Sequence, residues 1–516
     1  MTPLPADIWV PDTICAVLDR AVATAPDRPA LIAGDVTLTY AEYGQAVAAF
    51  AARLAGDGAR HGTVVLVLRN SIAMAIALFA VHRAGAISAA LNPDYTPREL
   101  APMIADAAPC IVIVHADLLD RVTALLPADA SVIVIGTDRE FADELLSADR
   151  SSLLDRSYAD TTAVLQFTGG TTGRAKGVEL THRAVAINIA QREAVLPTLF
   201  GDERVLCFMP MFHSFAAAMC LHLAAYSGGT LVILPRYRPD WVVDALVTHG
   251  ITRLPAGPTV FNGLLGFEGL TRAGCASLRC GYSGSAPLAR ETLARWEART
   301  GVPIYEGYGQ SEAGPVLTYQ GPSTGQIPGS VGPALPLTEL AIVDCTDPDR
   351  RLPVGESGEI VARGPQIMTG YRGQPNATDA ALRGGWLHTG DIGKITADGF
   401  LFIEDRKKDM AIVGGFNVYP REIDELLMAH PAVAAAAAVG VPDAYRGEVI
   451  VVFVVAASGT ALDAEMLAAH CAAGLARYKH PAQIHLVEAL PLTAVGKIDK
   501  VALRAIALTK RVSHVA

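Results

Sequence analysis

Short apolar runs alternate with longer segments of helical period through most of the chain. The runs with the length and composition of buried strands are residues 163–167, 205–209 and 230–234. Asp240 is placed to cap a helix that runs to His249, with Gly250 at its C-terminal end. Another strand starts at Ile251. This alternation of strands and helices predicts an α/β architecture.

The last hundred residues follow a different pattern. Pro420 begins a short amphipathic helix that ends before Pro431. The segments that follow are predicted as two strands, residues 433–441 and 449–455, and a helix near residues 462–476. They form a small α+β unit. The charged cluster at residues 405–409 follows a strand predicted at residues 400–403, and we expect the boundary between the two units there.

Composition narrows the class of protein. With 516 residues, and about 150 residues per domain, the chain is long enough for three or four lobes. Hydrophobic residues make up 51% and charged residues 18%, which is typical of an ordered globular protein. The 52 acidic and 42 basic residues give a net charge of −10, which argues against a nucleic-acid-binding protein.

Membrane and redox signals point to a cytoplasmic protein. The apolar run at residues 449–457 is too short for a membrane span, which needs roughly 20 residues. The start of the chain has neither the basic nor the long apolar region of a signal peptide. The eight cysteines are scattered without a CxxC pair, so we expect reduced thiols, no zinc site and no disulfide framework.

A loop rich in glycine and threonine follows the strand predicted at residues 163–167. Residues 168–177 are TGGTTGRAKG. Glycines let backbone N–H groups face an anion, and the threonine hydroxyls and a lysine add donors suited to a triphosphate. The loop is not a Walker A motif, because Ala175 rather than Gly precedes Lys176, and this disfavours a P-loop NTPase.

Further motifs extend this loop into a pattern that covers nearly the whole chain. They are PMFHSF (210–215), GYSGSAPL (281–288), EGYGQSEAG (306–314), GEIVARGPQIMTGY (358–371), GWLHTGDIG (385–393), DRKKDMAIVGGFNVYPREIDELL (405–427) and LPLTAVGKIDK (490–500). In kind and order they resemble the acyl- and aryl-CoA synthetases of the adenylate-forming superfamily, and most closely the long-chain fatty-acid–CoA ligases. Gly169 is a variant associated with the fatty-acid branch, and Ala175 replaces the more frequent proline.

The resemblance implies the domain organisation. A large N-terminal adenylate-forming domain, residues 1–405, would contain two α/β subdomains and a small β-barrel and would bind ATP and the acyl group. A small mobile α+β domain, residues 406–516, would follow, with the hinge near Lys408.

The resemblance also implies how ATP and Mg²⁺ are bound. Tyr308 would offer a flat face to adenine, Asp391 would accept the ribose hydroxyls, and Arg406 would support the ribose or the domain junction. Glu312 is the implied Mg²⁺ ligand, with Thr168 beside it; Mg²⁺ needs only one or two carboxylates besides phosphate oxygens and water. The implied ATP-binding set is Thr168, Gly169, Gly170, Thr171, Thr172, Gly173, Lys176, Ser283, Gly284, Ser285, Ala286, Pro287, Glu306, Gly307, Tyr308, Gly309, Gln310, Ser311, Asp391, Arg406 and Lys497.

The catalytic and acyl-binding residues follow from the same resemblance. Lys497 would bridge the carboxylate substrate and the α-phosphate, and a positioned ammonium there lowers the repulsion between them. The implied catalytic set is Lys497, Glu312, His213 and Thr168; the acyl-pocket set is His213, Phe261, Gly281 and Gly309; the CoA and hinge set is Lys408, Gly414, Gly415 and Phe416. The small residues 216–218 leave room for a tail. No lysine or arginine is evident for a second carboxylate, so we expect a largely apolar tail.

The expected function is the ATP-dependent activation of a carboxylic acid to acyl-AMP and its transfer to CoA, with a medium- or long-chain fatty acid as the leading substrate. An aryl-acid CoA ligase and an acyl-AMP ligase that loads a carrier protein are the alternatives. The second of these usually has an insertion that is not evident before Arg406. A degenerate homologue is disfavoured because Lys497, Glu312 and Asp391 are all present. Peripheral membrane contact and a homodimer are both left open.

Overall fold

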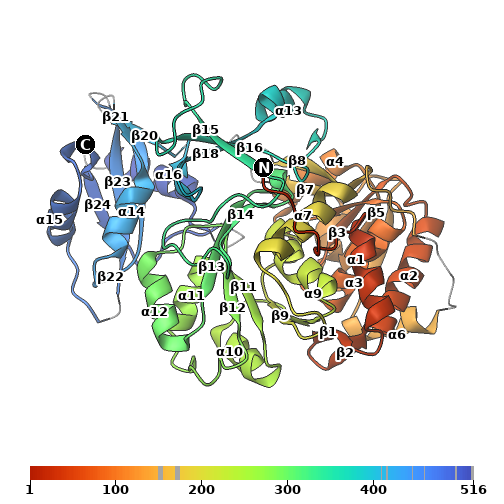
Figure 1. Ribbon diagram of the computed structural model, residues 1–516. Helices are drawn as coiled ribbons and strands as arrows, with labels where there is room; N and C mark the ends of the chain where they lie inside the picture. The colour runs from red at the N-terminus through yellow and green to blue at the C-terminus, as the bar shows by residue number, and fades with distance from the viewer. Residues whose placement is uncertain are drawn as a thin grey trace.

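The computed structural model describes residues 1–148, 155–168, 175–407, 409–413, 416–443, 446–457, 459–493 and 497–512. Within them the strands form four sheets, three before residue 407 and one after it, and helices cover the faces of the two large sheets and of the C-terminal sheet (Figure 1). The mixed α/β architecture predicted from the alternation of strands and helices is confirmed.

The first sheet has the strand order β17-β8-β7-β4-β3-β5-β6. Its strands are β3 (Thr63–Val67), β4 (Ile87–Ala90), β5 (Pro109–His115), β6 (Ser131–Ile135), β7 (Thr162–Thr168), β8 (Lys176–Thr181) and β17 (Gly370–Tyr371). The central pairs are parallel, whereas β7 and β8 run antiparallel on either side of the phosphate loop predicted from the sequence. Helices α4 (Pro97–Ala107) and α5 (Leu119–Thr123) pack on one face.

The second sheet has the order β14-β13-β12-β11-β9-β10-β1-β2. Its strands are β1 (Pro29–Ala33), β2 (Val36–Thr39), β9 (Arg204–Cys207), β10 (Thr230–Ile233), β11 (Arg253–Ala256), β12 (Cys280–Ser283), β13 (Ile304–Gly309) and β14 (Val316–Tyr319). Its outer face is covered by α10 (Pro239–Thr248), α11 (Pro258–Leu265) and α12 (Arg290–Thr300).

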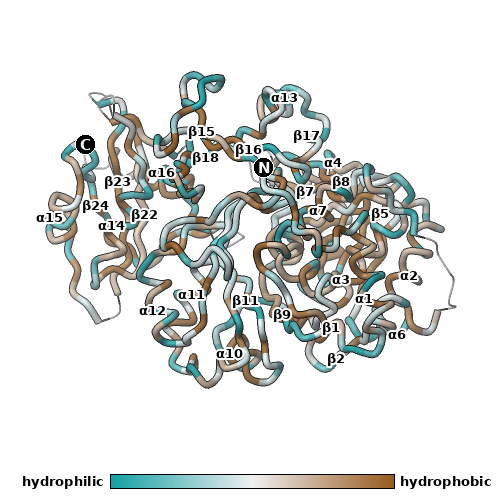
Figure 2. Tube along the Cα trace, in the orientation of Figure 1, coloured by the Kyte–Doolittle hydropathy of each residue, from teal (hydrophilic) through white to brown (hydrophobic). Residues whose placement is uncertain are grey.

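The largest core cluster lies between these two sheets. Helix α3 (Ile72–Arg83) is apolar on every side, so it can be stable only where it is surrounded by protein, and residues 72–82 are all buried. Side chains from both sheets pack around it, and Figure 2 shows the apolar residues gathered there. The helices that share this core with α3 are α1 (Ile14–Thr24), α2 (Tyr40–Gly56), α6 (Asp138–Ser147), α7 (His182–Val195) and α9 (Leu223–Tyr226).

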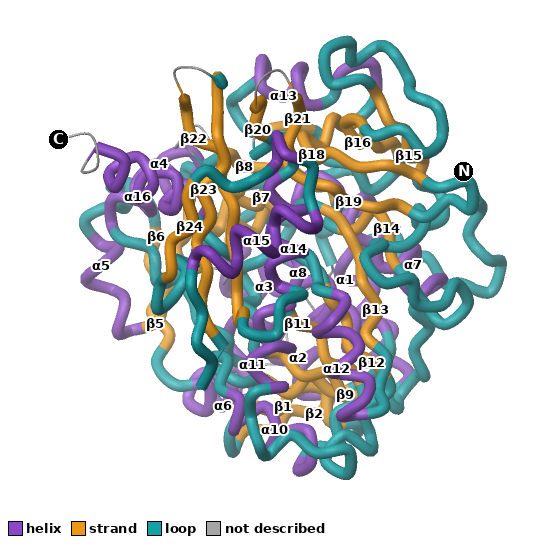
Figure 3. Tube along the Cα trace, turned by 90° about the vertical axis from the view of Figure 1, so that its left-hand side faces the viewer, coloured by secondary structure: helices purple, strands orange, loops and turns teal. Residues whose placement is uncertain are grey.

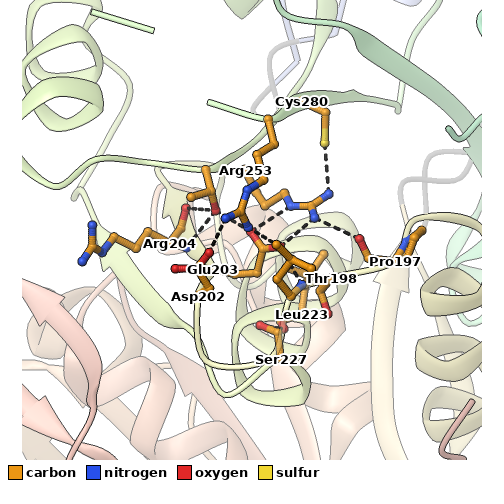
Figure 4. Close-up of polar contacts among 12 residues, drawn as sticks. Pro197, Thr198, Asp202, Glu203, Arg204, Leu223, Ser227, Arg253 and Cys280 are labelled. Carbon is orange, nitrogen blue, oxygen red and sulfur yellow. Dashed lines mark hydrogen bonds and ion pairs between the residues drawn. The ribbon is translucent and has the colours of Figure 1, made fainter. Parts of the chain in front are cut away.

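A buried ion pair joins neighbouring strands of the second sheet. Figure 4 shows the guanidinium of Arg253 directed at the carboxylate of Glu203, with nitrogen–oxygen distances of 2.6 and 2.9 Å. Arg253 also donates to Tyr282 Oη at 2.8 Å and to the carbonyl of Pro197 at 2.9 Å. The Glu203 side chain is fully buried, and Arg279 adds a second cation 3.1 Å from it. The cluster fixes β9, β11 and β12 to the segment that follows α7.

The third sheet is antiparallel, with the order β15-β16-β18-β19. Its strands are β15 (Glu339–Val343), β16 (Gly358–Arg363), β18 (Leu387–Ile395) and β19 (Leu401–Arg406). Helix α13 (Pro375–Ala381) lies between β17 and β18 in the chain. The register of the last pair places Asp391 opposite Arg406. Because of this pairing Asp405 and Arg406 end a strand, so the predicted strand at residues 400–403 extends into the charged cluster.

The C-terminal unit is a sheet with helices on both faces. Its strands are β20 (Ala411–Val413), β21 (Phe416–Val418), β22 (Val433–Asp443), β23 (Gly447–Ala456) and β24 (Gln483–Leu486). Figure 3 shows this unit from its outer side, with α14 (Pro420–Met428) and α15 (Ala464–Gly474) together on one face. Helix α16 (Lys500–Val512) packs on the other. The helices and strands predicted for this region are confirmed, with bounds that shift by a few residues.

The predicted cap of α10 is wrong. Arg238 occupies the N-cap position, Pro239 is the first helical residue, and Asp240 lies inside the first turn, where its carboxylate pairs with Arg238. Proline fits the first helical position because its missing N–H would have no intrahelical partner there. Gly250 does follow the helix end, and its φ of 58° is a left-handed conformation that glycine adopts without strain.

Candidate active site

Two residues of the predicted phosphate loop face each other at its base. Thr168 ends β7 and Lys176 begins β8, and they are partners in the antiparallel register. Residues Gly169, Gly170, Thr171, Thr172 and Gly173 lie outside the described residues. Thr181 ends β8 and caps α7, its hydroxyl accepting from the backbone N–H of Ala184 at 3.1 Å. The strand–loop–strand–helix order therefore fixes the base of the loop from both sides.

Tyr371 links Lys176 to Glu312. The Lys176 ammonium lies 4.7 Å from the centre of the Tyr371 ring, and the Tyr371 hydroxyl donates to Glu312 Oε1 at 2.9 Å. Burial, and then the neighbouring Glu312 charge, raise the pKa of Tyr371, so the phenol stays protonated. No role was predicted for Tyr371, although it ends the GPQIMTGY motif and therefore could have been found there. Tyr371, on β17, therefore lies between Lys176, which was predicted to bind phosphate, and Glu312, which was predicted to bind the metal.

The residues predicted for the nucleoside form a second group, around the buried Asp391. The Tyr308 hydroxyl donates to Asp391 Oδ2 at 2.6 Å, and Arg406 Nε lies 3.3 Å from Asp391 Oδ1. Burial, and then the Asp391 charge, raise the pKa of Tyr308 well above its ordinary value. The charge of Asp391 is the main cause of the raised pKa of Arg406. A carboxylate held between a phenol and a guanidinium can accept further hydrogen bonds from a diol.

Two glycines of the predicted ATP-binding set, Gly284 after β12 and Gly309 at the end of β13, lie where there is no room for a Cβ. A Cβ at Gly284 would meet the Phe215 ring at 2.9 Å, and one at Gly309 would meet the carbonyl oxygen of Pro315 at 1.9 Å. Ser285 holds a φ of 69°, which is costly for a residue with a side chain. The buried hydroxyl of Ser283 has no hydrogen-bond partner among the described residues.

The remaining residues of the predicted ATP-binding set lie just after β12, in β13, or just after β13. Ala286 and Pro287 follow Ser285, Gly307 packs against the Tyr319 ring, and Gln310 precedes the short helix η3 (Ser311–Ala313).

Glu306 is the buried acid at this junction. It is 4% exposed, and its carboxylate accepts from the backbone N–H of Leu288 at 3.3 Å. Burial raises its pKa to about 7, although Arg421 and Glu425 of α14 also act on its charge. Arg421 of α14 also donates to the carbonyl of Ile403 at 2.5 Å, so α14 of the C-terminal unit lies against β19 of the large domain.

His213 and Lys497 come from opposite parts of the chain, and the charge of Lys497 acts on the His213 ring. His213 precedes the short helix α8 (Ser214–Ala216), and its Nδ1 accepts from the backbone N–H of Phe215 at 3.2 Å. Burial, and then the charge of Lys497, lower the pKa of His213 to about 4, so the imidazole is neutral at physiological pH. The backbone N–H of Lys497 donates to Thr493 Oγ1 at 3.2 Å, which helps to hold the loop that carries it. Ser214 and Ser311 hydroxyls lie 3.3 Å apart beside this group.

Phe261, predicted to line the acyl pocket, is a core residue. Its ring is fully buried in the core between the second sheet and α12, 5.0 Å from the Trp296 ring and against Gly281. The geometry therefore gives no support to a part for Phe261 in an open acyl pocket. Ala216 and Ala218 are both buried.

The predicted CoA and hinge residues are only partly described. Lys408, Gly414 and Gly415 lie outside the described residues. The backbone of Phe416 begins β21, opposite Val413. In the part of the chain that the structure describes, no helix is long and apolar enough to cross a membrane.

Comparison with known proteins places this site in a family. Residues 18–372 match the model of the AMP-binding enzyme family, and residues 422–497 match that of the AMP-binding enzyme C-terminal domain. A long-chain-fatty-acid–CoA ligase of Salmonella typhimurium is 35% identical, with 95% of this chain and 94% of that protein covered. The 4-coumarate–CoA ligase 5 of Oryza sativa is also 35% identical, with 97% and 96% covered. The crystal structure of ATP-bound MatB from Rhodopseudomonas palustris superposes with a TM-score of 0.89 at 32% identity, covering 96% of this chain and 98% of that one.

The chain therefore belongs to the AMP-binding enzyme family. The prediction of an adenylate-forming enzyme of the acid–thiol ligase class is confirmed, and ATP and CoA are the co-substrates that the family uses.

Proposed function

We propose that this chain joins a fatty acid to CoA in two steps, through an acyl-adenylate, and releases AMP and pyrophosphate. The observation that carries the proposal is that the charge of Lys497, in the C-terminal unit, acts on the buried His213 beside α8 and lowers the pKa of its imidazole. This brings a cation from a distant part of the chain to the predicted acyl site. The acyl class comes from the relatives named long-chain-fatty-acid–CoA ligases.

In the first step a carboxylate oxygen of the acid attacks the α-phosphorus of ATP, and the bond from that phosphorus to the pyrophosphate oxygen breaks. Both reactants are negatively charged, so a cation between them lowers the barrier, and we assign this role to Lys497. Asp391, held by Tyr308 and Arg406, would bind the ribose hydroxyls. Neutral His213 would line the acyl site without adding charge.

The donor set fits a magnesium ion bound with ATP. Glu312 supplies one carboxylate and Thr168 one hydroxyl, and Mg²⁺ takes most of its remaining ligands from phosphate and water. Among the described residues, no three or more His, Cys, Asp or Glu side chains lie together so that they could hold a metal alone. When bound, the ion would neutralise phosphate charge. Tyr371 would keep the Glu312 carboxylate oriented.

In the second step the CoA sulfur attacks the carbonyl carbon, the bond to the AMP oxygen breaks, and the thiol proton leaves to solvent. We propose that the C-terminal unit, residues 406–516, turns about Lys408 between the steps and presents Gly414, Gly415 and Phe416 to the pantetheine arm. The gap between the two matched family regions, residues 372 and 422, contains this boundary and supports it.

An aryl acid is the second candidate substrate, because the 4-coumarate–CoA ligase of rice is as similar to this chain as the fatty-acid ligase of Salmonella. Mass spectrometry of products from ATP, Mg²⁺, CoA and a mixed panel of fatty and aryl acids tests both. Fatty acyl-CoA products support the proposal, and aryl-CoA products alone favour the alternative. Acyl-adenylate without thioester indicates a carrier-protein acceptor and contradicts the CoA step.

A further inference from the structure

Arg421 joins the two units of the chain across their boundary. It is the second residue of α14, in the C-terminal unit, and its Nη1 donates to the carbonyl of Ile403 in β19 at 2.5 Å. Its backbone N–H donates to Oδ2 of Asp405, in the same strand, at 3.0 Å. The two acceptors come before Lys408 in the sequence and the donor comes after it. Both bonds therefore cross the hinge predicted at Lys408.

The contacts of Arg421 are sheltered from water. The Arg421 side chain is 11% exposed, and Asp405 is 6% exposed. A hydrogen bond from a charged donor is stronger than one between neutral groups. Nε of Arg421 donates to Glu425 Oε1 at 2.9 Å, one turn further along α14, and this ion pair lies within the C-terminal unit. The guanidinium is therefore held by its own helix while it bonds to the strand of the other unit.

The backbone bond completes the start of α14. The first N–H groups of a helix have no partner within it. The N-cap residue, Tyr419, makes no capping bond from its side chain to the described residues of the helix. Asp405 supplies an acceptor from the large domain instead, and the helix dipole favours a carboxylate at this end. The capping of α14 therefore depends on how the two units are oriented.

Both bonds belong to the orientation in which Lys497 acts on the acyl site. In this structure the charge of Lys497 acts on the His213 ring. Ile498, next to Lys497, and helix α14 pack on opposite faces of one sheet, so they turn together. A turn of that unit about Lys408 separates Arg421 from its acceptors in β19 as it carries Lys497 away from His213.

We propose that Arg421 is a positioning residue that holds the C-terminal unit in the orientation that directs Lys497 to the acyl site, and that its bonds to β19 break before CoA is acylated. This inference rests on the proposed two-step function. Arg421 acts on the reaction through Lys497 and not by contact with the substrates. It therefore sets the balance between the two half-reactions.

The test measures the two half-reactions separately with the full-length enzyme. ATP–pyrophosphate exchange follows adenylation, and AMP release from supplied fatty acyl-adenylate and CoA follows thioester formation. When the two orientations exchange rapidly, each rate is proportional to the population of one of them, so the ratio of the rates reports their balance.

Arg421→Met keeps the length of the side chain and removes the guanidinium. The ratio of thioester formation to adenylation should rise about tenfold, without a fall in thioester formation. Arg421→Lys should give an intermediate ratio, because its ammonium can still donate to the carbonyl of Ile403.

Glu425→Gln is the matched control. It removes the charge that pairs with Arg421 inside α14, a contact that is kept in both orientations, so the ratio should stay within about threefold of the wild type. Hydrogen exchange in the peptide that starts α14, measured by mass spectrometry, needs no turnover. Exchange there should be faster in Arg421→Met than in the wild type and unchanged in Glu425→Gln, because opening of the contact exposes these N–H groups.

Two results overturn the proposal. One is an unchanged ratio in Arg421→Met. The other is an equal loss in both half-reactions while the melting temperature shows that the variant is folded, because a merely structural role slows both. If the wild type makes neither acyl-adenylate nor thioester, the proposed function fails by itself. The exchange measurement then decides the role of Arg421: faster exchange in Arg421→Met supports a hold between the two units, and unchanged exchange overturns it.

Discussion

The hydrogen bond from Tyr308 to Asp391 offers the most direct test of the nucleoside site. Tyr308→Phe removes one oxygen atom and keeps the ring, so any stacking on adenine is retained. The lost bond is short, 2.6 Å, and its acceptor is a carboxylate that is only 5% exposed. After the change Asp391 keeps Arg406, at 3.3 Å, as a partner.

The size of the effect follows from this geometry. Hydrogen bonds to charged groups contribute about 1.5–3 kcal/mol net, and 1.4 kcal/mol corresponds to a factor of ten. If Asp391 binds the ribose, the KM for ATP should rise by about 10- to 150-fold. Because the removed hydroxyl donates to Asp391, which is assigned to the ribose and not to the acid, the KM for the acid should change less than the KM for ATP. ATP–pyrophosphate exchange measures both constants in the adenylation step alone.

Tyr305→Phe is the control for this variant. Tyr305 lies on the same strand, β13, and its hydroxyl makes no hydrogen bond within the described part of the chain. Its loss should leave the KM for ATP within about threefold of the wild type. The reasoning is refuted if Tyr308→Phe also changes this constant by less than threefold, or if the two variants have equal effects.

Three further outcomes are expected. Lys497→Ala should slow adenylation by about 10²–10³-fold while acyl-adenylate supplied directly still gives thioester; normal pyrophosphate exchange would contradict its role. Burial raises the pKa of Glu306 to about 7 from 4.5, so stability should fall as the pH rises between these values, by roughly 3 kcal/mol in all. Glu306→Gln should remove this dependence, which melting temperatures at pH 5.5 and 8 would check, and an unchanged difference would refute it. Arg253→Met leaves the buried Glu203 carboxylate without its main partner and should cost about 3–5 kcal/mol by chemical denaturation. Adding Glu203→Leu should recover much of that loss, and no recovery would argue against the buried charge as its cause.

Local patterns determined the elements of this protein. The spacing of apolar residues predicted β22, β23 and α14 within a few residues. It could do so because the buried faces of a strand or helix require apolar residues at a regular spacing along the chain. The cap of α10 was missed, since Arg238, Pro239 and Asp240 offer competing starts within one turn. The strand predicted at residues 400–403 was too short, because only the register of β19 with β18 shows that Asp405 and Arg406 belong to it.

The sequence by itself determined the family, because its motifs are contiguous and their order is fixed along the chain. It also named the candidate residues for binding the phosphates, the ribose and the carboxylate substrate. Tertiary structure alone decided which of them meet. Tyr371 reaches Glu312 and Lys176 across a long stretch of sequence, and Phe261 packs in the core. Those facts depend on the packing of segments distant in the chain, and no local pattern of residues encodes such contacts.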